Sequence, residues 1–97
     1  MAKFHFTQKA KEDLDSIWIY TFENWSESQA DTYFTGIITA CQHIADHPKF
    51  LDIEYNEITQ GLFCHHYQKH LIFYFIVEDG IEVVRILHER MDIKSKL

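Results

Sequence analysis

The residues best suited to chemistry on a phosphate ester lie close together near the end of the chain. Arg85, His88 and Arg90 fall within six residues. Cleavage of RNA through its own 2′-hydroxyl needs a proton acceptor, a proton donor, and cations that stabilise the charge of the transition state. One imidazole between two guanidinium groups is a minimal set for this reaction, and Tyr74 would add a phenol if its strand lay beside Arg85. These four residues are the candidate catalytic set, should the protein cut RNA.

Each of these residues also has a purely structural interpretation. His88 could be an imidazole at a strand end, hydrogen-bonded to a neighbour. Arg85 could pair with Asp13, Glu12 or Glu82. Because breaking a buried ion pair costs several kcal/mol, loss of activity in an Arg85 variant would indicate a functional role only if the variant still folded.

Histidines and cysteines offer only incomplete metal sites. Alternation along a strand would let Cys64 and His66 share an ion, and helical spacing would let His43 and His47 do so. No zinc-finger spacing, H-E-x-x-H motif, glycine-rich phosphate loop or Ser-His-Asp order is present. We therefore expect neither a metal nor a cofactor.

The charge is negative overall and unevenly spread. The net charge of −6 argues against a protein that binds DNA or RNA by itself through a wide basic surface. Residues 1–57 hold four basic and ten acidic side chains, residues 58–97 five of each, and residues 85–97 four basic against two acidic. An anionic target would therefore be bound at the chain end, by Arg85, His88, Arg90, Lys94 and Lys96.

The length and composition predict one soluble domain over residues 1–97. The chain is 46% hydrophobic, with three glycines and one proline, so it can form a core. Cys41 and Cys64 are far apart and are expected to be reduced core thiols. The longest apolar run, residues 71–77, is too short to span a membrane, and no export signal is visible. We expect a cytoplasmic protein.

The first half of the chain predicts a short strand and two helices. Residues 3–6 are strand-like, and Thr7 can cap a helix over residues 8–24. Ser26 and Gln29 form a capping box for a second helix, which Pro48 ends. The short link between the helices requires an antiparallel hairpin. Their apolar stripes are Ala10, Leu14, Ile17, Trp18, Thr21 and Trp25, and Ala30, Tyr33, Phe34, Ile37, Cys41, Ile44 and Ala45.

Three large side chains of the first helix fall off its stripe. Ile19, Tyr20 and Phe22 would be covered either by a partner or by a second packing neighbour within the fold.

The second half predicts strands over residues 58–67, 70–77 and 81–88, after a loop over residues 49–56. If Asp79 and Gly80 are the central residues of a hairpin turn, Tyr74 lies opposite Arg85 and Ile76 opposite Val83. A slip of one residue would place Arg85 opposite Phe73 instead. Both faces of residues 70–77 are apolar, so this strand should be central, with the helix hairpin on one face and a second cover on the other.

The order β-α-α-β-β-β and several segments together resemble the ParE family of the RelE/ParE superfamily. The segments are His70-Leu-Ile-Phe-Tyr74, the block from Glu82 to Asp92, Ala10-Lys-Glu-Asp-Leu14 and His47-Pro48. Phe63 departs from the pattern, since the family often has a basic residue after Gly61-Leu62. The resemblance implies an α+β fold in which a short strand and a helix hairpin pack on a small, mainly antiparallel sheet.

The resemblance also implies the toxin of a type II toxin–antitoxin pair. ParE-like toxins block DNA gyrase in its DNA-cleaved state, whereas RelE-like relatives cleave mRNA on the ribosome. We expect a non-catalytic gyrase inhibitor, with a ribosome-dependent mRNA endonuclease as the alternative. A cognate antitoxin encoded alongside would cover Ile19, Tyr20 and Phe22, although a homodimer could bury the same side chains.

The tail after Arg85 has two interpretations. It could present its basic side chains to the gyrase–DNA complex. It could instead pack Met91, Ile93 and Leu97 as the second cover of the central strand, in which case removing residues 93–97 would unfold the protein.

Overall fold

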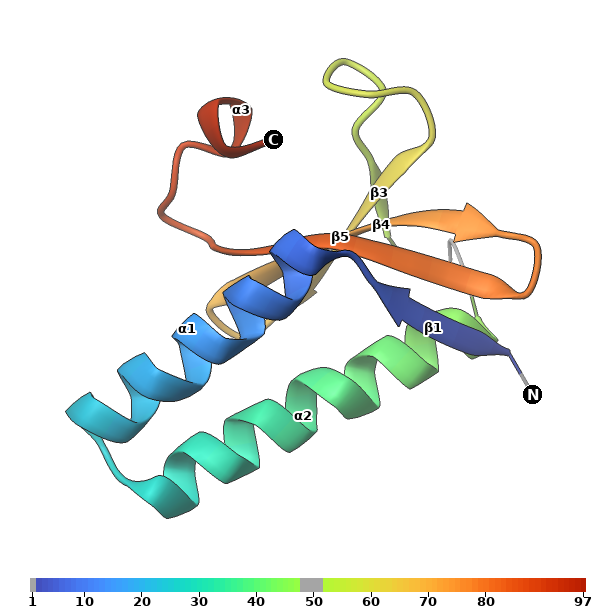
Figure 1. Cartoon of the computed structure of the whole chain (residues 1–97). Helices are drawn as coiled ribbons and strands as arrows, with labels where there is room; N and C mark the ends of the chain where they lie inside the picture. Colours follow the sequence, from blue (N-terminus) through green and yellow to red (C-terminus); the bar gives the residue numbers. More distant parts are fainter. Residues whose placement is uncertain (1, 48–51) are drawn as a thin grey trace.

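A helix hairpin packs against one face of a five-stranded sheet (Figure 1). The computed structural model describes residues 2–47 and 52–97. This α+β arrangement confirms the fold expected from the sequence. In chain order the elements are β1 (Lys3–Phe6), α1 (Gln8–Asn24), α2 (Glu27–Asp46), β2 (Ile53–Glu54), β3 (Leu62–Tyr67), β4 (His70–Val77), β5 (Gly80–His88) and α3 (Ile93–Lys96).

Both helices begin at the caps that the sequence predicts. The Thr7 hydroxyl accepts the backbone N–H of Ala10 at 3.2 Å, and the Ser26 hydroxyl accepts that of Gln29 at 3.0 Å. These bonds satisfy N–H groups that have no partner inside the helix. The predicted stop at Pro48 lies outside the described residues. Trp25, expected on the buried stripe, is 74% exposed because α1 ends one residue before it.

The strand order is β1-β5-β4-β3-β2, which places β4 at the centre as predicted. β1 runs parallel to β5, and the other pairs are antiparallel. Two strand boundaries differ from expectation. β2 lies within the predicted loop, and β3 begins at Leu62 rather than at Ile58. The residues between form turns closed by the Asn56 side chain, which accepts the N–H of Gly61 at 2.9 Å.

The register expected from a turn centred on Asp79 and Gly80 is wrong, because Tyr74 faces Val83 and Ile76 faces Ile81. The slipped alternative is confirmed for Arg85, which faces Phe73 beside an irregularity in the ladder. Gly80 is the first residue of β5 instead of a central turn residue. A Cβ at Gly80 would overlap the backbone of Lys3 in β1, so the glycine permits the parallel strand to approach.

The central strand is covered on both faces, as its sequence predicts. Ile72 and Tyr74 are fully buried in a cluster with residues of both helices. On the opposite face, Phe73 is buried under Tyr55, Ile58 and Ile93. Of the three tail residues expected to supply this cover, only Ile93 belongs to the cluster. The other two are partly exposed, Met91 at 45% and Leu97 at 36%.

Both cysteines are free and buried, as the sequence predicts, one in each cluster. Burial raises the pKa of Cys41 and of Cys64 to about 12. Since the thiolate is the reactive form, we expect a disulfide reagent at pH 8 to label both thiols at least about a hundredfold more slowly than free cysteine. Denaturant should release two rapidly reacting equivalents. Rapid labelling of the native protein would show that one of the two clusters opens readily.

Candidate functional site

Arg85 ties three separate segments together. Its Nε and Nη2 groups donate to the two carboxylate oxygens of Asp13 in α1, at 2.8 and 3.0 Å, and its Nη1 donates to the backbone carbonyl of Lys96 at 2.7 Å. Asp13 also accepts the backbone N–H of Ile86 at 2.9 Å. The two side chains are only 18% and 15% exposed, and the hydrogen bonds to Asp13 raise the pKa of Arg85. Of the three pairings left open by the sequence, the structure contains the one with Asp13.

We expect Asp13→Asn to lower the free energy of unfolding by about 1 to 3 kcal/mol, because three donors converge on this largely buried carboxylate. Urea denaturation measures the change. Glu23→Gln removes an exposed carboxylate from the same helix and should change the stability by less than about 0.5 kcal/mol. Equal stabilities for the two variants would contradict a stabilising role for the pair.

Tyr74 is bound by a different residue from the one that binds Arg85. Its hydroxyl donates to the carboxylate of Asp52, whose other oxygen lies 2.8 Å from Nδ1 of His65. The Asp52 side chain is only 5% exposed. Tyr74 is therefore held by the segment before β2, whereas Arg85 is held by α1 and the tail. The sequence predicts only a loop over residues 49–56, and no local signal marks Asp52 as the partner of a buried tyrosine.

His88 lies at the end of β5, where the structural interpretation expects it. Its Nδ1 accepts the backbone N–H of Arg90 at 3.1 Å, so neutral His88 carries its proton on Nε2. His70 is directly opposite in β4, with 5.3 Å between the ring centroids. Nδ1 of His70 is 2.7 Å from the Tyr33 hydroxyl of α2. Of the four candidate catalytic residues, His88 and Arg90 are joined by this backbone hydrogen bond, whereas Arg85 and Tyr74 are bound to Asp13 and Asp52.

His70 should make stability depend on pH. Its burial, and then the nearby His88, lower the pKa of His70 to about 4. Between pH 6.5 and 4 the unfolded chain binds a proton that the folded chain does not, so this stability is complete above pH 6.5 and is lost as the pH falls. We expect His70→Gln to reduce the decline in unfolding free energy between pH 7 and 4.5 by on the order of 2 kcal/mol, allowing for partial solvation of the ring.

Urea denaturation at each pH tests this expectation. The exposed His47 provides the control, because His47→Gln should leave the pH dependence nearly unchanged. A decline of the same size in the wild type and His70→Gln would contradict it.

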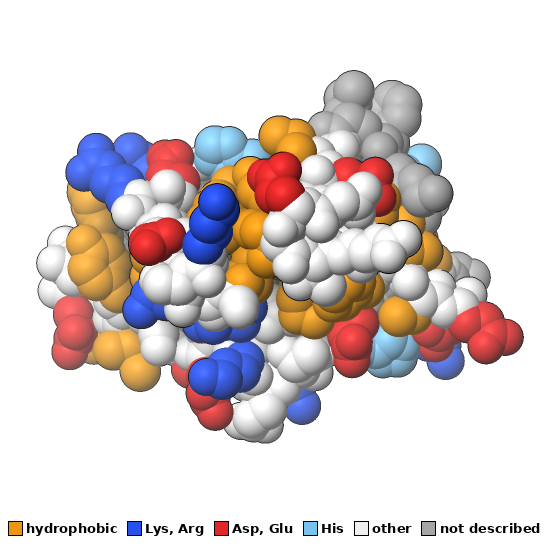
Figure 2. All heavy atoms as spheres, turned by 90° about the horizontal axis from the view of Figure 1, so that it is seen from above, with side chains coloured by type: hydrophobic (Ala, Val, Ile, Leu, Met, Phe, Trp, Pro, Cys, Tyr) orange, Lys and Arg blue, Asp and Glu red, His pale blue; other side chains and the backbone are white. Residues whose placement is uncertain are grey.

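The remaining cations of the tail are exposed. Arg90, Lys94 and Lys96 have no ion pair among the described residues. Figure 2 shows the face that carries α3: basic and acidic side chains are interspersed, and a strip of hydrophobic side chains is exposed between them. This face therefore has no wide basic surface.

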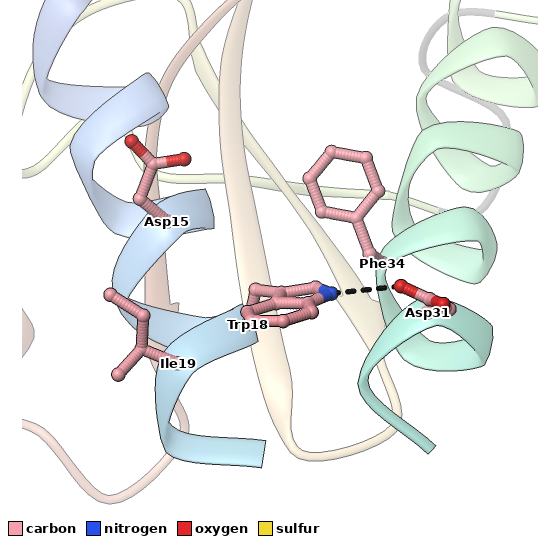
Figure 3. Close-up of a pocket in the computed structure, with 5 residues that line it drawn as sticks. All are labelled: Asp15, Trp18, Ile19, Asp31 and Phe34. Carbon is pink, nitrogen blue, oxygen red and sulfur yellow. Dashed lines mark hydrogen bonds between the residues drawn. The ribbon is translucent and has the colours of Figure 1, made fainter. Parts of the chain in front are cut away.

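The apolar patch of the hairpin consists of Ile19, Tyr20 and Phe22, which are 51%, 64% and 47% exposed. Within the described part of the chain, no second packing neighbour buries them. Beside the patch lies a hollow of about 440 Å³ between α1 and α2 (Figure 3). We call it the hairpin groove. Its lining residues are Asp15, Trp18, Ile19, Asp31 and Phe34.

Two further properties concern the described residues as a set. Nowhere in residues 2–47 and 52–97 do three histidine, cysteine or acidic side chains gather as a metal would require. None of the helices in those ranges has the length and hydropathy of a membrane span.

Comparisons with known proteins agree with one another. Residues 4–93 match the model of the family described as ParE toxin of type II toxin-antitoxin system, parDE. Toxin ParE1 of Caulobacter vibrioides is 30% identical over 103 residues, covering 100% of this chain and 99% of the relative. Toxin ParE1 of Mycobacterium tuberculosis is 30% identical over 97 residues, covering 99% of this chain and 98% of the relative.

Solved structures share the fold. A structure of the chromosomal ParDE TA system from P. aeruginosa superposes with a TM-score of 0.74 at 16% identity, covering 91% of this chain and 96% of the other. The toxin–antitoxin complex RelBE2 from M. tuberculosis gives a TM-score of 0.66 at 15% identity, covering 91% and 98%.

Proposed function

This chain belongs to the ParE family and is the toxin of a type II toxin–antitoxin system, and from that premise we propose that it inhibits DNA gyrase by binding alone. In this proposal the toxin acts in the cytoplasm, makes and breaks no covalent bond, uses no cofactor, and is neutralised by a cognate antitoxin encoded alongside it.

The observation that carries the non-catalytic proposal is that two of the four candidate catalytic side chains are engaged by internal carboxylates. Arg85 is bound to Asp13, and Tyr74 is bound to Asp52 on a different segment. His88 contacts Arg90 only through the Arg90 backbone N–H. General acid–base catalysis needs both groups within hydrogen-bond reach of one substrate, so this arrangement favours binding over cleavage.

The proposed gyrase-binding surface is the chain end. His88, Arg90, Lys94 and Lys96 supply its positive charge, and all but His88 are exposed. Arg85 contributes by positioning, because its guanidinium holds the carbonyl of Lys96 and is neutralised by Asp13. The anchored tail presents its cations with less loss of conformational freedom on binding than a disordered tail would.

The proposed antitoxin-binding surface is the apolar patch on α1. Three large exposed apolar side chains within one helical turn of α1 are typical of an interaction surface. An amphipathic segment of the antitoxin would cover them. A homodimer that buries the same patch is the competing arrangement, and the mass of the purified toxin with and without antitoxin distinguishes the two.

Neutralising the tail without removing its backbone tests the gyrase proposal. In Arg90→Gln/Lys94→Gln/Lys96→Gln, the Lys96 carbonyl and the Ile93 contact are retained, so the fold should persist. Each exposed contact contributes little by itself, but loss of all three charges should weaken trapping of cleaved DNA by purified gyrase at least about tenfold. The matched control, Lys3→Gln/Lys9→Gln/Lys11→Gln, removes three exposed cations elsewhere and should trap gyrase as the wild type does.

Both variants should still bind antitoxin, which confirms that they are folded. If the tail variant traps cleaved DNA on gyrase as well as the wild type does, the tail is not the gyrase-binding surface. Cutting of mRNA on purified ribosomes by the wild type, with no effect on gyrase, would overturn the proposed function in favour of the endonuclease.

A further inference from the structure

The hairpin groove combines an apolar floor with two carboxylates. Trp18 projects from α1 toward α2 and forms the floor between Asp15 on one side and Asp31 on the other (Figure 3). The indole is fixed from two directions: its ring stacks on Phe22 at 5.3 Å between centroids, and its Nε1 donates to Asp31 at 3.0 Å. The floor is therefore formed before any partner arrives.

The two carboxylates carry uncompensated negative charge. Asp15 makes no hydrogen bond or ion pair with the described residues, and Asp31 accepts only the neutral indole N–H. The two helices hold two lysines against seven acidic residues, and one of the seven, Asp13, is already paired with Arg85. An apolar partner alone would leave these charges partly desolvated, whereas a cation would neutralise them.

From this geometry we infer that the hairpin groove binds a lysine or arginine of the antitoxin, carried next to a large apolar side chain on the same segment. The inference rests on the proposed function, since it names the chemistry by which the antitoxin is recognised. The long side chain lies along the indole, where its stem contacts the aromatic surface and a guanidinium would also gain a cation–π contact. Its charged end reaches the carboxylates, and the neighbouring apolar group covers Ile19 and the patch.

The charge complementarity excludes a purely apolar helix as the best occupant. It also predicts how the complex forms: opposite charges at an exposed groove raise the association rate and make it sensitive to salt. Recognition of this kind would distinguish an antitoxin with a basic residue at this position from one with an acidic residue there.

The test uses the full-length toxin and its purified antitoxin. Asp15→Asn/Asp31→Asn keeps the shape of both side chains, and the amide oxygen introduced at position 31 can still accept the Trp18 N–H, so the groove remains while its charge is lost. We expect the affinity at low salt to fall about 10- to 100-fold. The matched control, Glu23→Gln/Glu27→Gln, removes two exposed charges from the same hairpin outside the groove and should change the affinity less than about threefold.

Salt and charge reversal complete the experiment. Raising the salt should weaken the wild-type complex more than the double-amide variant, so that their affinities converge. Asp15→Arg should abolish tight binding, and changing the matching basic residue of the antitoxin to glutamate should restore it.

Three outcomes overturn the inference. If the wild type binds antitoxin but the double-amide variant binds equally well, the groove chemistry is wrong and the proposed function stands. If the wild type forms no complex with the antitoxin, both the proposed antitoxin partnership and this inference are wrong. If the toxin alone dimerises and the amide substitutions dissociate the dimer, a second copy of the toxin occupies the hairpin groove.

Discussion

The bidentate pair between Asp13 and Arg85 is the contact on which the rest of the structure depends. It joins the first helix to the last strand, and the same carboxylate accepts a backbone N–H from that strand. The guanidinium then continues to the carbonyl of Lys96. One arginine thus fixes the angle of the helix hairpin, the end of the sheet and the position of the tail. The pair is largely buried, and its hydrogen bonds offset the cost of removing both charges from water.

The two proposed binding surfaces lie on the elements that this pair joins, and their charges have opposite sign. The hairpin exposes aromatic and aliphatic side chains among carboxylates, whereas the tail exposes Arg90, Lys94 and Lys96. In the proposed function, opposite charge on separate elements would keep this acidic protein from being repelled uniformly by anionic DNA, since the segment proposed to approach the DNA is locally positive.

Most of the helices and strands could be predicted from local sequence, because helix caps and the apolar patterns of strands are local. Thr7 and Ser26 start the helices through bonds to residues three positions ahead, and the two-faced run of β4 identifies the central strand. The register could not be predicted, because the position of Gly80 is set by its close approach to Lys3 at the other end of the chain. The buried role of Asp52 was missed for the same reason: its partners, Tyr74 and His65, are distant in sequence. Helical spacing predicted that Ile19, Tyr20 and Phe22 lie off the buried stripe, but it left open whether the fold itself covers them. The carboxylates of the groove were not predicted, since they meet only when the two helices pack.

The parallel pairing of β1 with β5 also determines when the molecule can be completed during synthesis. Residues 3–6 have no strand partner until residues 80–83 have left the ribosome. The ion pair of Asp13 forms later still, because it needs Arg85. The helix hairpin and the hairpin of β3 and β4 each join elements that follow one another in the sequence, so they can form earlier. Residues 85–97 are therefore made and anchored after the helix hairpin. In the growing chain, the hairpin that we assign to the antitoxin is exposed before the segment that we assign to the target has been made.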